Sequence, residues 1–106
     1  MPLTLNQIAK GAVPTSETDA HSAVPSGKTW MENFASFQNQ SGAARTINIK
    51  LIDTDGTTVL QHVTEDIPTG GTNWPVVLDW PVEASQKVRW QASGASVYGL
   101  IKGVKN

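Results

Sequence analysis

From residue 28 onward, hydrophobic and polar residues alternate with the two-residue period of β-strands. The clearest case is RTINIKLID, residues 45–53, where Ile47, Ile49 and Leu51 fall on one face and polar residues on the other. This alternation predicts a strand with one buried face and one face in solvent.

The segment 30–37 has the same period, but Asn33 interrupts it. Trp30 falls on the face that we predict to point outward, together with Glu32, Phe34 and Ser36. The inward face is predicted to hold Met31, Ala35 and Phe37.

Turn signals separate the remaining strands. Asp55-Gly56 predicts a hairpin. Pro75 and Pro81 enclose a short apolar run that suits an edge strand, because proline cannot donate a hydrogen bond to a neighbouring strand. The remaining predicted strands cover residues 57–63, 76–78, 87–93 and 96–104.

Six or seven short strands with regularly spaced turns predict an all-β fold, because no segment after residue 22 shows a helical period. A sheet with one apolar face must bury it against a second sheet when no helices are available. We therefore expect a single antiparallel β-sandwich, jelly-roll or immunoglobulin-like, over residues 23–106. Its predicted core is Met31, Ala35, Phe37, Ile47, Ile49, Leu51, Val59, Ile67, Val77, Val88, Trp90 and Ile101.

Residues 1–22 lack a sustained period. Leu3, Leu5 and Ile8 are compatible with one helical turn, but Gly11 and Pro14 interrupt it. We interpret this segment as an extended N-terminal arm whose three apolar side chains bind a neighbouring protein.

Composition narrows the choice of function. The 106 residues carry a formal net charge of −1, which gives no support for binding to nucleic acid or to an anionic membrane. There is no cysteine, so disulfides and zinc–thiolate sites are excluded. The N-terminus lacks the basic start and apolar run of a signal peptide, so export by that route is not expected.

Gly27-Lys28-Thr29 raises the possibility of a phosphate-binding loop, but the pattern is incomplete. Ser22 stands where that loop needs its first glycine, and Pro25 removes a backbone donor. We interpret residues 24–27 as a turn in which Gly27 adopts a positive φ.

No catalytic, cofactor or metal site is predicted. His21 and His62 have no second ligand at a metal-like spacing. Asp53-Thr54-Asp55-Gly56 resembles the start of a calcium loop, but threonine occupies positions 57 and 64 where further ligands are needed. No nucleophile, base and acid fall into a recognisable pattern, so an enzyme is not expected.

The tryptophans exceed what a core of this size requires. Trp74 and Trp80 are six residues apart, so a regular strand places both on one face. Two interpretations stay open: both are packed in the core, or they lie exposed with Trp30 as part of a partner-binding surface.

Taken in order, several strings resemble small structural proteins of tailed bacteriophages. These are VPSGKTW at residues 24–30, Asn39-Gln40-Ser41-Gly42, AARTINIKL at 43–51, KVRWQAS at 87–93 and the final Gly103-Val104. The family pattern begins VPAGKT and continues with NTSG on a β-sandwich. The resemblance covers residues 20–104 and departs at Ser85-Gln86, where the family commonly has Gly-Asp.

This resemblance implies a non-enzymatic component of the phage particle, made in the bacterial cytoplasm. The expected role is a capsid decoration (cement) protein that binds the major capsid protein or other virion proteins, or else a neck or tail accessory protein. A homo-oligomer is implied, with a trimer as the family analogy. A different class of function stays open: a tail-associated carbohydrate-recognition module in which Trp74, Trp80 and Tyr98 stack on sugars beside Asn73 and Asp79.

Overall fold

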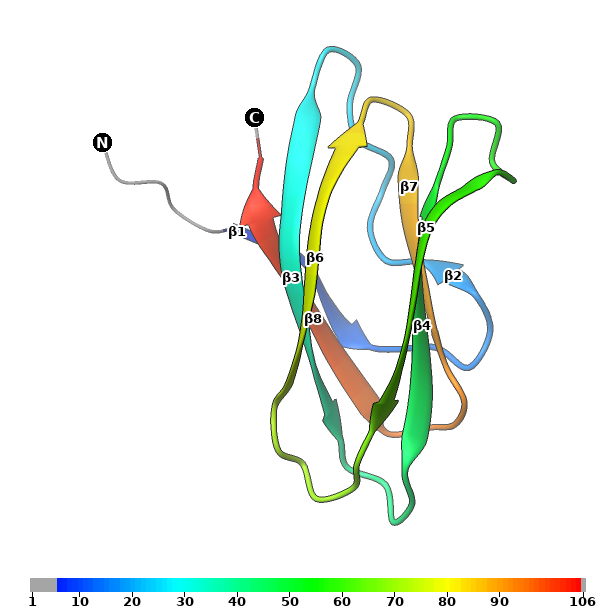
Figure 1. Ribbon diagram of the computed structural model, residues 1–106, viewed down its shortest axis with the longest axis vertical. Helices are drawn as coiled ribbons and strands as arrows, with labels where there is room; N and C mark the ends of the chain where they lie inside the picture. The colour runs from blue at the N-terminus through cyan, green and yellow to red at the C-terminus, as the bar shows by residue number, and fades with distance from the viewer. Residues whose placement is uncertain (1–5, 106) are drawn as a thin grey trace.

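Two antiparallel β-sheets pack face to face in the computed structural model, which describes residues 6–105 (Figure 1). No helix among these residues could span a membrane. The strands are β1 (Asn6–Ala12), β2 (Thr18–Asp19), β3 (Thr29–Asn39), β4 (Arg45–Ile52), β5 (Val59–Ile67), β6 (Trp74–Glu83), β7 (Lys87–Ala92) and β8 (Val97–Val104).

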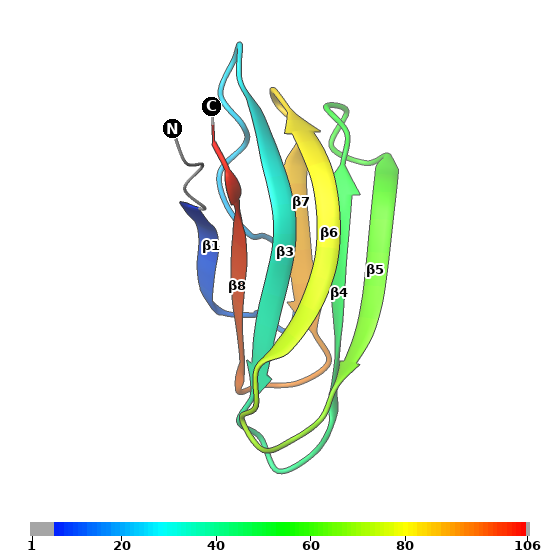
Figure 2. The same cartoon turned by 60° about the vertical axis from the view of Figure 1, so that its left-hand side comes forward.

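The strand order identifies the type of sandwich. One sheet, here called sheet A, has the order β1-β8-β3-β6, and the other, sheet B, has the order β2-β7-β4-β5 (Figure 2). Only β4 and β5 are consecutive strands that pair directly, and the other connections cross between the sheets. Eight strands in this arrangement form a jelly roll. The predicted antiparallel sandwich is confirmed, and the topology selects the jelly roll over the immunoglobulin-like alternative.

The described part of the expected N-terminal arm belongs to the sandwich. β1 pairs with β8 from Asn6 to Ala12, and β2 pairs with β7 at Trp90 and Arg89. The sequence signal is weak because the pairing of β1 shifts register between Gln7 and Ala9, so that Ile8 and Ala9 are both buried. Residues 1–5, which include Leu3 and Leu5, lie outside the described residues.

Nine of the twelve predicted core residues are buried between the sheets. They are Ala35, Phe37, Ile47, Ile49, Leu51, Ile67, Val88, Trp90 and Ile101. The alternation in β4, β7 and β8 is regular, so their inward faces follow the sequence directly.

The prediction for the first half of β3 is wrong, because the strand contains a β-bulge. Glu32 pairs with Gly103 and Phe34 with Lys102, so Asn33 is an extra residue between two consecutive positions of β8. An extra residue exchanges the two faces of a strand. Trp30 is consequently buried, and Met31, expected in the core, is 38% exposed.

Two further core predictions are wrong. The edge strand β6 runs from Trp74 to Glu83, longer than predicted, and it buries Val76 and Leu78 while Val77 between them is 73% exposed. Val59 is exposed because it begins β5, the outer strand of sheet B.

Asn39 joins three segments at one end of the sandwich. Its fully buried amide nitrogen donates to the carbonyls of Ala43 (2.8 Å) and Ile67 (3.0 Å). Its side-chain oxygen accepts hydrogen bonds from the backbone N–H (3.0 Å) and the hydroxyl (2.6 Å) of Ser41. The backbone N–H of Gly71 donates to its carbonyl at 3.0 Å. The Asn-x-Ser-Gly string is therefore a structural motif that fixes the β3–β4 and β5–β6 loops.

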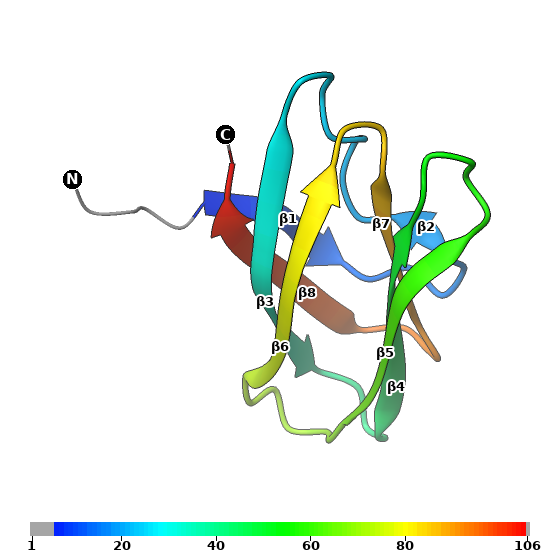
Figure 3. The ribbon, with the colours of Figure 1, turned by 45° about the horizontal axis from the view of Figure 1, so that its top comes forward.

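At the other end, the loop before β3 meets the β6–β7 turn (Figure 3). The N–H of Lys28 donates to the carbonyl of Pro25 at 3.1 Å, and Gly27 has φ 77°. Gly27 therefore takes the third position of a β-turn over residues 25–28 that requires a positive φ. The predicted turn and the positive φ of Gly27 are confirmed, but the turn lies one residue later than the predicted 24–27. Pro25 occupies the first position of the turn.

Replacing Gly27 with valine should destabilise the fold by about 1–3 kcal/mol, because a residue with a Cβ is strained at this φ. Gly42→Val is the matched control, since Gly42 lies in a loop without a positive φ and has free space around it. Urea unfolding of both variants measures the difference. Equal free energies of unfolding would show that Gly27 is not required for its conformation.

Asn39→Leu should lower the free energy of unfolding by about 2–4 kcal/mol, because it keeps the branched shape of the side chain but leaves buried partners without hydrogen bonds. The exposed neighbour Gln40 provides the control, and Gln40→Leu should change stability by less than about 0.5 kcal/mol. A loss at Asn39 no larger than that at Gln40 would contradict the role of the amide.

Candidate partner-binding surface

The outward face of sheet B is polar, and its side chains pair with one another. Lys50 contacts Glu17 at 2.9 Å, and Asp19 contacts Arg89 at 3.0 Å and Lys87 at 3.5 Å. Side-chain hydrogen bonds continue across β4 and β5, from Thr46 to Asp66 and among Asn48, His62 and Thr64. Such a face is well matched to water.

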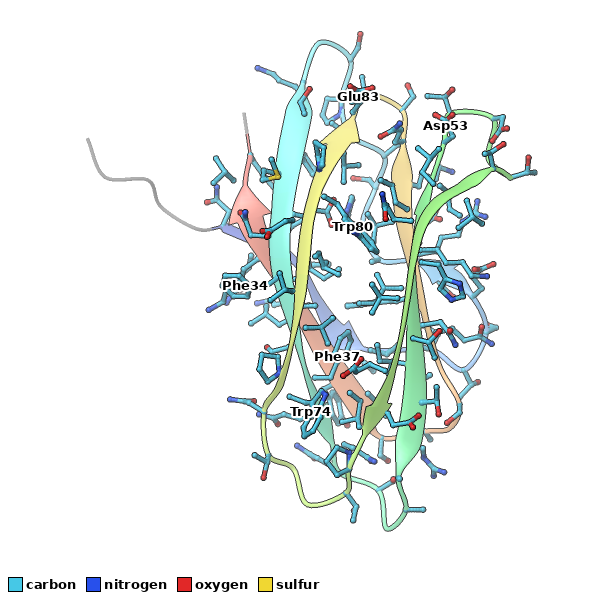
Figure 4. The ribbon with its side chains drawn as sticks, in the orientation of Figure 1. Phe34, Phe37, Asp53, Trp74, Trp80 and Glu83 are labelled. Atoms are coloured by element: carbon cyan, nitrogen blue, oxygen red, sulfur yellow. The ribbon has the colours of Figure 1, made fainter. Side chains whose placement is uncertain are left out.

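The outward face of sheet A is different in character. Val77 and Tyr98 are 73% and 45% exposed, and they lie on opposite sides of β3. Figure 4 shows Phe34 pointing away from the sandwich while Phe37 points between the sheets. We call this surface the apolar face, and its members are Met31, Phe34, Pro75, Val77, Pro81, Tyr98, Leu100 and Val104.

The register brings these side chains together in rows across the sheet. Met31 on β3 lies between Pro81 on β6 and Val104 on β8. One row further, Phe34 pairs with Val77. A contiguous apolar patch on a small protein marks a site of protein contact more often than isolated exposed residues do.

A shallow hollow lies at one end of the apolar face. It has a volume of about 220 Å³ and lies between Tyr98 and Leu100 on β8 and Ser36 and Gln38 on β3. The amide of Gln38 donates to the side-chain oxygen of Asn73 at 2.7 Å on its border. This end of the face can therefore receive a small side chain with a polar tip.

The two tryptophans of β6 do share one side of the strand, as their spacing predicts, but this side faces the core. Trp80 is 6% exposed, and Figure 4 shows it between the sheets. Trp74 lies at the end of the sandwich, 36% exposed, and its indole N–H donates to the Glu65 carboxylate at 3.2 Å. Packing is therefore the correct interpretation for Trp80.

Other residues proposed for partner binding are also in the core. Ile8 and Trp30 are 6% and 8% exposed. Leu3 and Leu5 lie outside the described residues. The residues of the apolar face are the ones that sequence reasoning missed, although the alternation at Tyr98, Leu100 and Lys102 already placed an aromatic and an aliphatic side chain opposite the core.

The expected sugar-binding platform is not assembled. Trp80 is buried between the sheets, whereas Tyr98 lies on the apolar face, so the two rings cannot stack on one ligand. Asp79 accepts a hydrogen bond from Asn33 at the bulge and stands apart from Trp74 on the other side of β6. Only Asn73 and Tyr98 of that set share a surface, at the hollow.

One pair of titratable side chains is buried. The Nε2 of His21 lies 2.9 Å from Oε2 of Glu32, and both side chains are almost completely shielded from solvent. The Nδ1 of His21 lies 2.7 Å from the Ser22 carbonyl. Because both ring nitrogens face oxygen acceptors, the geometry favours the doubly protonated imidazolium. The ring also packs against Trp30, with centroids 5.3 Å apart.

The pKa of His21 is raised above its ordinary value of 6.5. Burial acts to lower this pKa, but the hydrogen bond and charge of Glu32, together with the Ser22 carbonyl, outweigh burial. Among the described residues, Oε1 of Glu32 has no hydrogen-bond partner. The pair is an internal ionic contact that joins the loop after β2 to the bulged part of β3.

Metal binding finds no support in residues 6–105, where no group of three or more His, Asp or Glu side chains could hold an ion. His62 lies on the outward face of sheet B and contacts Asn48 at 2.9 Å. The Asp53–Thr58 loop is the predicted hairpin, in which Asp55 accepts hydrogen bonds from Thr57 and Thr58. Those bonds, first among them the one from the Thr58 hydroxyl, lower the pKa of Asp55 to about 2.

The His21–Glu32 pair should make the stability of the protein depend on pH. A pKa that is higher in the folded state contributes stability that is complete below the unfolded value and is lost as pH rises through the folded value. We therefore expect the melting temperature to fall as the pH rises above about 6.5, the ordinary pKa of histidine. The Glu32→Gln variant, which lacks the charge, should show a flatter dependence, and parallel profiles for the two proteins would contradict the assignment.

Comparisons with known proteins add little to this description. No protein-family model matches the chain, and no curated protein sequence matches it. Among solved structures, the chain is similar to one in the crystal structure of the T13 IBDV viral particle, with a TM-score of 0.47 and 14% sequence identity. The similarity covers 96% of this chain and 30% of that one, so the chain spans less than a third of the virus protein's length. At this TM-score and identity, the similarity carries no argument about function.

Proposed function

We propose that this chain is a non-enzymatic structural protein of a bacteriophage particle that binds other virion proteins. The observation that carries the proposal is the apolar face, a surface of sheet A that has no role in the core of the chain itself. A rigid sandwich with one polar face and one apolar face is suited to a permanent contact through the latter.

Two further observations support this role. The jelly roll is a recurrent fold of viral capsid proteins, although it also occurs in lectins and enzymes, so it does not assign a function alone. The strings that resemble phage structural proteins occupy structural positions here. Gly27 forms the turn before β3, and the amide of Asn39 fixes two loops.

The specific role that we propose is capsid decoration, with the major capsid protein as the partner. A cement subunit stabilises a shell by binding to the assembled form and not to its separated subunits, which is stabilisation by mass action. The work is mechanical and requires neither a cofactor nor a reactive group. Synthesis in the bacterial cytoplasm and residence in the virion follow from this role.

A neck or tail accessory protein is the alternative within the same class, and copy number separates the two. A decoration protein covers the shell repeatedly, whereas a neck or tail component forms a closed ring with about a dozen copies or fewer per particle.

Quantitative mass spectrometry of purified particles tests the proposal. For a decoration protein, we expect a number of copies close to that of the major capsid protein, or a sizeable fraction of it. A known neck protein and a host cytoplasmic protein in the same sample calibrate the low-copy and contaminant levels. If the number of copies per major capsid protein matches that of the neck protein, the chain is a neck or tail accessory protein and not a decoration protein. If it matches that of the host contaminant, the virion assignment is wrong.

A further inference from the structure

Acidic and basic residues lie on different strands of the outward face of sheet A. On the β6 side, Asp79 and Glu83 point outward and are exposed. On the opposite side, Lys10 of β1 and Lys102 of β8 point outward, at positions that pair with Leu100 and Phe34 respectively. The outward acidic residues therefore lie on β6, where Asp79 is between Val77 and Pro81, and the basic residues lie on β8 and β1, where Lys102 is between Leu100 and Val104.

The acidic residue Asp79 and the basic residue Lys102 also lie at nearly the same position along the strand direction. Asp79 belongs to the β6 segment that lies between the partners of Glu32 and Phe34, and Lys102 is the partner of Phe34 on β8. An acidic and a basic residue thus stand at nearly the same level on opposite sides of β3. This arrangement is self-complementary under a suitable rotation.

We propose that the apolar face is the interface of a two-fold homodimer in which two copies of this chain stack sheet A against sheet A. A two-fold axis that lies in the interface and runs along β3 places β6 of one copy over β8 of the other. Asp79 of each copy then approaches Lys102 of the partner copy, and this contact occurs twice.

Electrostatics distinguishes this axis from its alternative. An in-plane axis perpendicular to the strands places β6 over β6, so that Asp79 and Glu83 of one copy meet the same residues of the other. Like charges across an interface oppose association. The charge pattern therefore favours the two-fold axis parallel to the strands over the perpendicular one.

The available area is sufficient for a reversible dimer. The three overlapping strands, β3, β6 and β8, are about 4.8 Å apart and eight residues long, and they cover roughly 400 Å² of flat surface on each copy. Two such faces bury about 800 Å² together, which is below the size of stable specific interfaces and corresponds to a weak dimer. Sheet B cannot serve in the same way, because its outward charges already form ion pairs within the chain.

This inference goes beyond the proposed function and does not rest on it. The dimer uses the same apolar face, so in a dimer the contacts with other virion proteins would be made through the remaining surfaces of the pair. A dimer also differs from the trimer that family analogy implies. The composition of the particle and the mass of the free protein are separate measurements, so either proposal can fail while the other stands.

Sedimentation velocity over a micromolar to millimolar concentration series tests the interface. The full chain should approach twice its mass of 11.3 kDa. Val77→Asp should raise the dissociation constant at least about tenfold, because it replaces the most exposed apolar side chain of the face with a charge. Leu60→Asp is the control, since Leu60 is an exposed aliphatic residue on sheet B (42% exposed), and it should leave the dissociation constant unchanged.

Charge variants test the direction of the axis. Lys102→Glu and Asp79→Asn should each weaken the dimer, and the asparagine tolerates the positive φ of 52° at position 79. The double variant Lys102→Glu with Asp79→Lys should regain affinity relative to Lys102→Glu. Thermal unfolding shows whether each variant remains folded.

Several outcomes would overturn the proposal. They are a mass of one chain at every concentration, a trimer, or an equal effect of Val77→Asp and Leu60→Asp. A dimer that is insensitive to both Lys102→Glu and Asp79→Asn would reject the axis parallel to the strands.

Discussion

The extra residue Asn33 in β3 determines which side chains in half of sheet A point into the core and which point to solvent. Its insertion turns Trp30 and Glu32 toward sheet B and leaves Met31 in solvent. The neighbouring strands accommodate the same irregularity, since β1 has an extra residue at Ile8 and β6 adopts a positive φ at Asp79. Opposite Glu32, Gly103 leaves room that a Cβ would take from the Met31 carbonyl. The inserted residue exchanges the inward and outward faces of β3, and both the buried ionic pair and the apolar face follow from this exchange.

The two ends of the sandwich are held by different chemistry. Asn39 is neutral, and its amide satisfies carbonyls and donors from two loops, so the bonds at that end do not depend on protonation. Glu32 is charged and relies on His21, which comes from a separate loop. The hydrogen bonds of Asn39 are thus insensitive to proton concentration, whereas the contact between His21 and Glu32 responds to it.

Regular alternation made much of the fold predictable from the sequence. β7 has a regular period-two pattern and β4 has one up to Leu51, so their inward residues follow from the sequence, whereas buried Ile52 and Val97 were not predicted. The Asp55-Gly56 hairpin and the Gly27 turn were predicted because their backbones need residues that tolerate a positive φ. The bulge was not predictable in this way, because an inserted residue looks like a polar interruption until its neighbours' register is known.

The surface was harder to predict than the core. Tryptophans drew attention as possible contact residues, but Trp30 and Trp80 fill the core. Smaller side chains such as Val77 and Leu100 form the apolar face, and each of them is unremarkable in the sequence. Their significance comes from register, which places residues from three strands in common rows. Pairing between distant strands is information that local patterns do not contain.

The prolines of β6 limit how copies of this molecule can associate. Pro75 and Pro81 interrupt the row of N–H groups along one free edge of sheet A, and the irregular backbone at Asp79 bends the strand between them. Strand-by-strand polymerisation from this edge is therefore disfavoured, even where many copies are crowded together. Ordered arrays that use this side of the molecule must instead grow through faces and loops, where shape and charge limit the number of neighbours.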